Sequence, residues 1–263
     1  MLFYWLRQRR RRKVVSQPFP MEWLSYLETN VALYHLLAKE EQARLRDDLR
    51  IFNMEKEWEG CGGLEMTDEI KVTIAGLACM LVLGLDHDYY RRVQSILVYP
   101  AGYRVPNQEA IGDNAILEGA SDRLGEAHYR GPVVLSWDEA LHDARNPGAG
   151  RNLVFHEFAH QLDMLDGVID GTPPLRDSKQ YRRWQKVMTA EYQQLIAQSE
   201  AGEPTLLDEY GATNEGEFFA VATECFFDQP TAMARRHPRL YDLLRDYFRQ
   251  DPAARERRHG QQI

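Results

Sequence analysis

Cysteine is scarce in this sequence, and the few cysteines form no pattern. The 263 residues include Cys61, Cys79 and Cys225, and none of them belongs to a C-x-x-C pair. An odd and widely spaced set argues against a disulfide framework and against a cysteine-rich zinc knuckle. Such a set is typical of a protein in the reducing cytosol, so we expect a cytoplasmic location.

Long apolar runs are also missing. The most apolar stretch, IAGLACMLVLGL at 74–85, has twelve residues, whereas a helix needs about 20 to cross a bilayer. The first residues include the apolar run LFYWL at 2–6, but the arginines follow it, which is the reverse of a secretory signal. The sequence therefore predicts neither a membrane span nor a signal peptide.

Positive charge is concentrated in one place. Residues 7–13 read RQRRRRK, and the rest of the chain carries −14 once these six charges are set apart from the net −8. An acidic body repels nucleic acid, so we expect no direct nucleic-acid binding. We predict a basic, flexible N-terminal tail at 1–18 and a single domain at 19–263. Residues 2–13 could touch an anionic membrane surface through their aromatic residues and arginines, and a solvated tail is the alternative.

The hydrophobic pattern indicates helices at both ends of the chain and strands between them. Expected helices cover 21–52, 66–85, 154–167, 179–198, 215–228 and 238–249. Expected strands lie at 93–100 and at the start of 131–140, with short strands and turns at 111–131. The order favours an α+β fold, mostly helical with a small sheet beside the helix of 154–167.

That helix carries the motif with the clearest chemistry, VFHEFAHQLDMLDG at 154–167. His156 and His160 are four residues apart, so on a helix both imidazoles reach one metal ion. Glu157 lies about 100° round the helix, where it faces a metal-bound water without ligating the metal, as a general base must. A buried helix with ordinary histidine hydrogen bonds is the alternative to a metal site.

A catalytic zinc ion needs a third protein ligand and an open fourth position. The longer pattern H-E-x-x-H-x-x-G-x-x-H fails here, because Asp163 replaces the glycine and Asp166 replaces the histidine. Asp166 could ligate, but without the glycine the chain is less free to turn back toward the metal. Asp163 is better placed as a hydrogen-bond acceptor behind the site or as a helix-packing residue.

A later segment, DEYGATNEGEFFAVATECFFDQP at 208–230, offers two other carboxylates. Glu217 and Glu224 are seven residues apart and share one helix face. Their burial beside so many apolar residues needs a reason. Metal ligation by one and a hydrogen bond to a histidine by the other would supply it. Glu217 also fits a capping box begun by Asn214, and Glu224 could face solvent, so spacing alone leaves the choice open.

The blocks NLVFHEFAHQLD and DEYGATNEGEFFAVATECFF, with GPVVLSW and YFRQDP, together resemble the Mlc titration factor A family of zinc peptidases over about residues 22–255. The resemblance implies a zincin-like metallopeptidase domain with the fold of the lethal-factor type. It implies one Zn²⁺ per chain, for which the ligands by position are His156, His160 and Glu217. It further implies Glu157 as general base, Tyr210 as the residue that steadies the oxyanion, and supporting positions for Asp163 and Glu224.

The same resemblance implies two kinds of function. One is hydrolysis of peptide substrates of the aminopeptidase type, and the other is capture of the glucose-responsive repressor Mlc. We expect a zinc-dependent, aminopeptidase-like enzyme that also regulates by binding a transcriptional repressor. The alternative is a non-catalytic protein that sequesters a sugar-responsive DNA-binding repressor. The intact H-E-F-A-H favours retained chemistry, because a pure binding protein has no need of Glu157.

Overall fold

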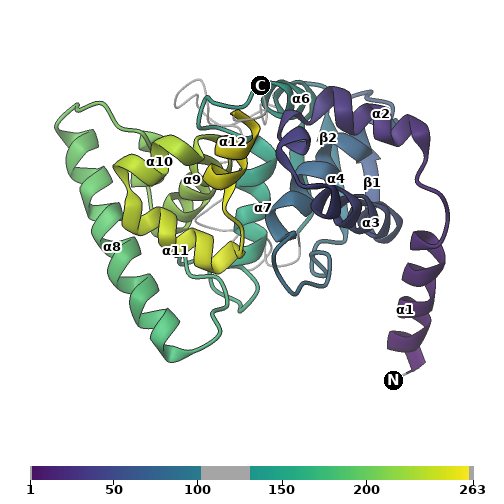
Figure 1. The fold of residues 1–263 in the computed structure, drawn as a ribbon, viewed down its shortest axis with the longest axis horizontal. Helices are drawn as coiled ribbons and strands as arrows, with labels where there is room; N and C mark the ends of the chain where they lie inside the picture. The colour runs from purple at the N-terminus through teal and green to yellow at the C-terminus, as the bar shows by residue number, and fades with distance from the viewer. Residues whose placement is uncertain (1, 102–130, 261–263) are drawn as a thin grey trace.

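The computed structural model describes residues 2–101 and 131–260, which form many helices and one small sheet (Figure 1). The strands β1 (Glu57–Gly60), β2 (Ser95–Tyr99) and β3 (Val133–Ser136) are parallel and lie in the order β1-β2-β3. Trp58 pairs with Ile96, which in turn pairs with Val133. Alternate residues of a strand point to one face, and the side chains that turn inward and are buried are those of Ile96, Val98, Val133 and Leu135.

The helices of the N-terminal half are α1 (Leu2–Val15), α2 (Met21–Asn30), the 3₁₀ helix η1 (Ala32–Leu36), α3 (Lys39–Glu55) and α4 (Asp68–Val82). Helix α4 connects β1 to β2 and is buried along most of its length. It begins where the Thr67 side chain accepts the N–H of Ile70, a standard N-cap. It packs against α2, α3 and α7, so its apolar character on all sides follows from its central place.

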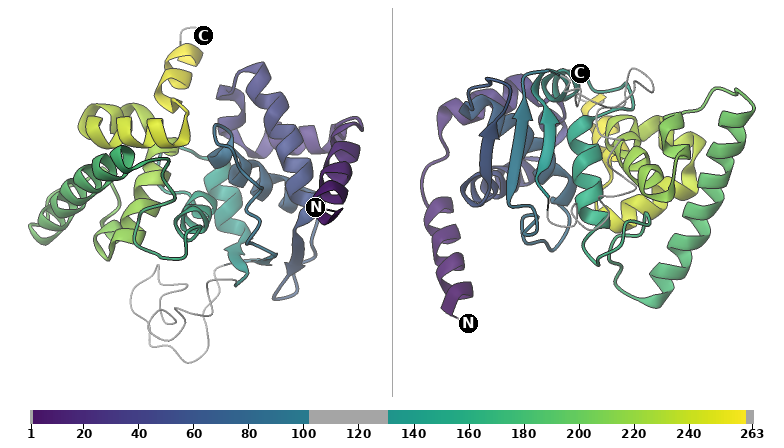
Figure 2. Two further views of the ribbon diagram at one scale, coloured as in Figure 1. Left: turned by 90° about the horizontal axis from the view of Figure 1, so that it is seen from below. Right: turned by 180° about the vertical axis from the view of Figure 1, so that it is seen from behind.

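The helices of the C-terminal half are α6 (Trp137–Arg145), α7 (Leu153–Asp163), α8 (Ser178–Glu200), η4 (Glu209–Ala212), α9 (Glu215–Asp228), α10 (Pro230–Arg236), α11 (Pro238–Phe248) and α12 (Pro252–Gly260). Helix α7 lies in the middle of the molecule, between the sheet with α4 on one side and α9 on the other (Figures 1 and 2). Buried aromatic rings of α7 pack in both directions, since Phe158 contacts Phe52 and Tyr90 and Phe155 contacts Phe227 of α9.

The coarse α+β assignment is confirmed, since the described chain is mostly helical with one small parallel sheet. The helices expected at 66–85, 179–198, 215–228 and 238–249 appear as α4, α8, α9 and α11. The structure adds β1, α6, α10 and α12, which the pattern does not predict. The short strands and turns expected at 111–131 fall, except for the last residue, outside the described residues.

The segment assigned to a flexible tail differs from that expectation, because residues 2–15 form helix α1. Arg11 is only 6% exposed, and its Nε and Nη2 atoms donate to the Glu55 carboxylate at 2.6 and 2.7 Å. Its Nη2 also lies 2.7 Å from Asp88. Charge composition shows only that the segment is basic, whereas the acidic partners that hold α1 on α3 come from distant residues.

None of the helices in the described ranges is both long and apolar enough to cross a membrane.

Candidate metal centre

Helix α7 has a fixed starting point, set by side chains from three other places. The Asn152 side chain accepts the N–H of Phe155 at 3.0 Å, and Asp143 of α6 accepts the N–H of Leu153 at 2.9 Å. The preceding turn is held by Asp228, at the end of α9, which accepts the N–H of Gly150 at 2.5 Å. The turn before α7 is therefore tied to the last turn of α9, and the two helices pack closely.

His156 and His160 lie on one face of α7, as their spacing predicts. Their ring centroids are 4.8 Å apart, and their Nε2 atoms are 3.2 Å apart. The other faces of α7 are buried through Val154, Phe155 and Phe158. Both histidines are partly exposed, so their rings are not sealed off from solvent.

Helix α9 brings Glu217 to the same point. The Asn214 side chain accepts the N–H of Glu217 at 2.9 Å, so the backbone half of the expected cap is present. The Glu217 side chain turns toward α7 instead of back to the cap. Its Oε2 atom lies 3.0 Å from His156 Nε2 and 3.3 Å from His160 Nε2. Glu217 therefore takes part in the helix cap through its backbone N–H and approaches the histidines through its side chain.

The three ligand atoms converge as they would around a metal ion. Glu217 Oε2 is buried, yet it makes no hydrogen bond of ordinary geometry. Ligand atoms on a tetrahedral zinc ion, each at about 2.0–2.1 Å from it, stand about 3.3 Å apart, which matches the observed 3.0 to 3.3 Å. Within residues 2–101 and 131–260, His156, His160 and Glu217 are the one group of three that could hold a metal. Two imidazoles and a carboxylate suit zinc among the common ions.

The charge state of the cluster also suits a cation. Burial acts to raise the pKa of Glu217, but the two imidazoles beside it hold that pKa well below its ordinary value. Burial acts to lower the pKa of His156, but Glu217 and Glu224 together raise that pKa well above its ordinary value. The Glu217 carboxylate is therefore ionised at neutral pH, and the pocket around His156 favours positive charge.

Glu224 lies on the opposite edge of the His156 ring from Glu217. Its Oε1 atom is 2.7 Å from His156 Nδ1, and its Oε2 atom accepts the N–H of Asn152 at 2.5 Å. The side chain is buried, with 5% of the residue exposed. A carboxylate that accepts the Nδ1 proton leaves the Nε2 lone pair free and fixes the plane of the ring. Geometry therefore separates the two glutamates that spacing could not, because only Glu217 reaches the Nε2 side.

The two aspartates near the end of α7 do not join the cluster. Asp163 is fully buried, and its Oδ2 atom accepts the N–H of Gly171 at 2.9 Å, which ties the loop after α7 to the helix. Burial raises the pKa of Asp163 to about 6. Asp166 is exposed and accepts the N–H of Val168 in a local turn, so the structure gives no support to Asp166 as a ligand.

Glu157 and Tyr210 both lie beside His156. Glu157 is partly exposed on α7, and its charge contributes to the raised pKa of His156. Tyr210 belongs to η4, and its ring centroid is 6.0 Å from that of His156. Asp208 positions this short helix, because its Oδ1 atom accepts the N–H of Tyr210 at 2.9 Å and its Oδ2 atom lies 2.5 Å from Arg151 Nε.

Sequence reasoning missed the residues that hold the site together, namely Asp143, Asn152, Asp208 and Asp228. Asn152 stands directly before the motif helix, so an N-cap signal was available there. Asp208 caps η4 locally, but its partner Arg151 lies 57 residues earlier. Asp143 and Asp228 gave no local signal, because their partners lie on other elements. Asp228, for example, holds a turn 78 residues earlier.

Comparison with known proteins agrees with this geometry. The model of the family described as glucose-regulated metallo-peptidase M90 matches residues 5–249. This chain belongs to that family. The match begins within α1 and extends through α11, so it covers every residue of the cluster. Membership of a metallopeptidase family implies a bound metal, and the His156, His160 and Glu217 cluster fits that implication.

Three bacterial proteins of similar length resemble this chain over most of its sequence. It is 37% identical over 244 residues to an uncharacterized protein of Synechocystis, covering 92% of this chain and 89% of that protein. It is 31% identical over 248 residues to Mlc titration factor A of Klebsiella pneumoniae, covering 92% and 91%. It is 30% identical over 230 residues to Mlc titration factor A of Salmonella agona, covering 84% and 83%. The resemblance noted from the sequence blocks is thereby confirmed.

Proposed function

We propose that this protein is a zinc-dependent peptidase of aminopeptidase type, with a zincin-like fold of the lethal-factor kind. His156, His160 and Glu217 hold one Zn²⁺, and Glu157 and Tyr210 carry out the chemistry around it. The observation that supports this most is the convergence of three ligand atoms at 3.0 to 3.3 Å from one another. Glu217 Oε2, one of these three atoms, is buried without a hydrogen bond of ordinary geometry, which supports a metal ion as its partner.

The chain's own residues then have separate tasks. Bound zinc supplies a Lewis acid that polarises a carbonyl and lowers the pKa of water. Glu157, one residue after the first histidine, accepts a proton from the attacking water and later delivers it to the leaving amine. The Tyr210 phenol donates its O–H to the oxyanion that forms on the scissile carbonyl. Glu224 keeps the His156 ring in plane, and Asp163 keeps the loop after α7 in place.

Strand β3 is our candidate for the peptide-binding strand. It ends the described sheet on the side away from β1, and it contacts α7. An extended peptide could pair with the outer edge of such a strand through main-chain hydrogen bonds. Replacing Val134 with proline removes one backbone donor, and unchanged peptide turnover in that variant would count against this role.

The name shared by two of these relatives supports a second candidate function. Mlc titration factor A, as its name says, titrates Mlc, so this chain could bind a transcriptional repressor of that kind. Such binding would not need Glu157. Three free cysteines support the cytoplasm as the place for either activity, because thiols stay reduced there.

Hydrolysis of an alanine-amide chromogenic substrate by wild type, Glu157→Gln and Glu215→Gln tests the enzymatic proposal. Glu215 is exposed on the first turn of α9 and serves as the matched control. We expect wild type and Glu215→Gln to turn over the substrate and Glu157→Gln to lose turnover. A zinc-loaded wild type that hydrolyses no peptide, but binds a repressor equally well with and without Glu157, would favour the second candidate.

A further inference from the structure

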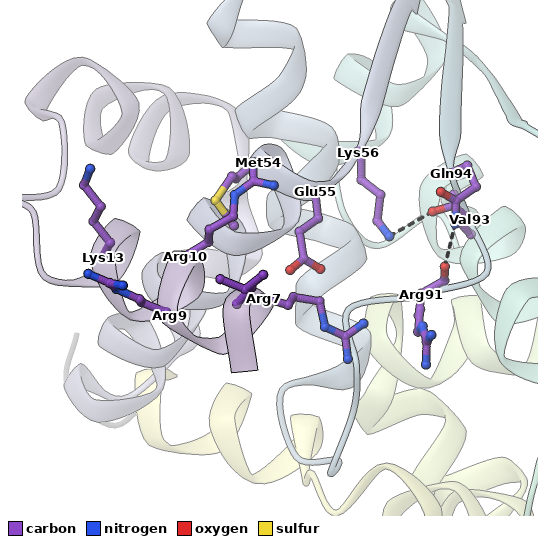
Figure 3. A pocket seen from close by; sticks show the side chains of 11 residues that line it. Arg7, Arg9, Arg10, Lys13, Met54, Glu55, Lys56, Arg91, Val93 and Gln94 are labelled. Carbon is purple, nitrogen blue, oxygen red and sulfur yellow. Dashed lines mark hydrogen bonds between the residues drawn. The ribbon is translucent and has the colours of Figure 1, made fainter. Parts of the chain in front are cut away.

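A basic groove lies on the opposite side of the N-terminal half from α8, well separated from the metal cluster along the chain. Its volume is about 800 Å³, and it lies between α1, the end of α3 with Lys56 directly after it, and the loop before β2 (Figure 3). Six cationic side chains line it, which are Arg7, Arg9, Arg10, Lys13, Lys56 and Arg91. We call this hollow the α1 groove.

The acidic residues near the α1 groove are already paired. Glu55 lines the groove, but Arg11 binds both of its oxygens at 2.6 and 2.7 Å. Asp88 lies 2.9 Å from Arg7 and 2.7 Å from Arg11. In the part of the chain that the structure describes, no carboxylate forms an ion pair with the remaining cations, Arg9, Arg10, Lys13 and Arg91.

The groove also holds a buried ammonium group. Lys56 is 7% exposed, and its Nζ atom donates to the carbonyl oxygens of Tyr90 and Val93 at 2.8 and 2.9 Å. Burial lowers the pKa of Lys56 to about 8, so the group is still mostly charged at neutral pH. Two neutral carbonyls do not cancel that charge. Both walls of the groove, the one formed by α1 and the one formed by the rest of the protein, therefore carry positive charge.

Cations gathered this closely repel one another, and that repulsion destabilises the compact state. The net charge of −14 outside residues 7–13 offsets the repulsion only at long range. Ordinary solubility would not require this gathering of cations. An anion between α1 and the body would neutralise both walls, and phosphate groups are the anions that arginine recognises best.

The end of α1 indicates where those phosphates come from. Tyr4, Trp5 and Leu6 are 62%, 50% and 42% exposed, and they precede the arginines on the same helix. This helix stands at the outer edge of the molecule, with the N-terminus at its tip (Figures 1 and 2). Tryptophan and tyrosine beside arginine favour the headgroup level of a bilayer. A soluble phosphate compound gives no reason to expose three apolar side chains.

We propose that the α1 groove and the exposed tip of α1 dock the protein onto an anionic phospholipid surface. Headgroup phosphates enter the groove between Arg9, Arg10 and Lys13 on one wall and Arg91 on the other. Tyr4, Trp5 and Leu6 lie among the headgroups without spanning the membrane. The acidic body faces away from the surface, since like charges repel it.

Sedimentation of the full chain with vesicles tests this docking. The vesicles contain phosphatidylcholine alone or an equimolar mixture of phosphatidylcholine and phosphatidylglycerol. We expect binding to the mixture alone, and weaker binding at high salt because surface charges are screened. The variant with Arg9→Gln, Arg10→Gln and Lys13→Gln should bind about a hundredfold less tightly, given the contribution of each basic residue near an anionic surface.

A matched variant separates the groove from net charge. Lys179→Gln, Arg182→Gln and Lys186→Gln together remove three exposed cations from α8, and this variant should bind the mixed vesicles like wild type. Equal loss in both triple variants would overturn the proposal, because it would show a general charge effect. Trp5→Ser should weaken vesicle binding and leave the affinity for inorganic pyrophosphate unchanged. Binding of pyrophosphate or of a DNA oligonucleotide without binding of the mixed vesicles would also overturn it.

Discussion

Replacing Glu224 with glutamine should weaken metal binding without unfolding the protein. In the native protein the Glu224 carboxylate faces two donors, the Asn152 N–H at 2.5 Å and the His156 Nδ1–H at 2.7 Å. A glutamine offers one acceptor and one NH₂ donor in the same space. If the amide NH₂ faces the Asn152 N–H, two donors oppose each other. If it faces His156 Nδ1, the His156 proton must move to Nε2, where it blocks the lone pair that faces the metal.

The magnitude follows from these two contacts. A buried donor without a partner costs about 1–3 kcal/mol, which for a domain of this size lowers the melting temperature by about 2–6 °C. Loss of an outer hydrogen-bond partner weakens metal affinity by about 10–100-fold, which corresponds to about 1.4–2.7 kcal/mol.

Competition for zinc against a chromogenic chelator measures the affinity, and thermal unfolding of the metal-free protein measures the stability. Glu215→Gln on the same helix is the control, since Glu215 is exposed on the first turn of α9. Wild-type zinc affinity in Glu224→Gln, or a loss no greater than in Glu215→Gln, would refute the reasoning about the His156 ring.

Three further changes test other parts of the account. Glu157→Gln should keep zinc at wild-type affinity and lower peptide turnover by about 10²–10⁴-fold, measured as metal content and turnover on one sample; lost zinc would make Glu157 a ligand. Asp163 has its folded pKa raised to about 6, above the unfolded value of about 3.9, so metal-free wild type should lose stability as pH rises from about 4 to 6. In Asp163→Asn the melting temperature should fall less over this pH range. An equal fall in both proteins would show that Asp163 is not the group responsible. Gly171→Ala places a methyl group 2.3 Å from the Glu215 carbonyl oxygen at φ +72° and should destabilise, by urea unfolding, clearly more than Gly202→Ala. Gly202 has φ +65° with nothing within 4 Å, so both variants share the left-handed cost of about 1–2 kcal/mol, and equal effects would exclude the clash.

Local signals explain why parts of the fold could be predicted. Helix α9 runs from Glu215 to Asp228, as expected, because Asn214 is a strong N-cap and Pro230 follows its end. The four-residue spacing of His156 and His160 likewise needs only a helix to bring both rings to one side.

Other features depended on contacts across the chain. Strand β1 reads EWEG at 57–60 and has no strand signal of its own; pairing with β2 overrides its composition. Arg11 fixes α1 through Glu55, which lies 44 residues later. Glu217 and Glu224 share one helix face in the sequence, and only the packing of α7 on α9 decides which of them meets the Nε2 atoms.

Metal content of wild type, Glu217→Ala and Glu215→Ala, measured by mass spectrometry after identical purification, tests whether His156, His160 and Glu217 hold one zinc ion. We expect about one zinc per chain in wild type and in Glu215→Ala, as for a single site with three protein ligands. We expect Glu217→Ala to lose most of its zinc, because only two imidazoles of one helix remain. Full zinc occupancy in Glu217→Ala would show that the third ligand is another carboxylate.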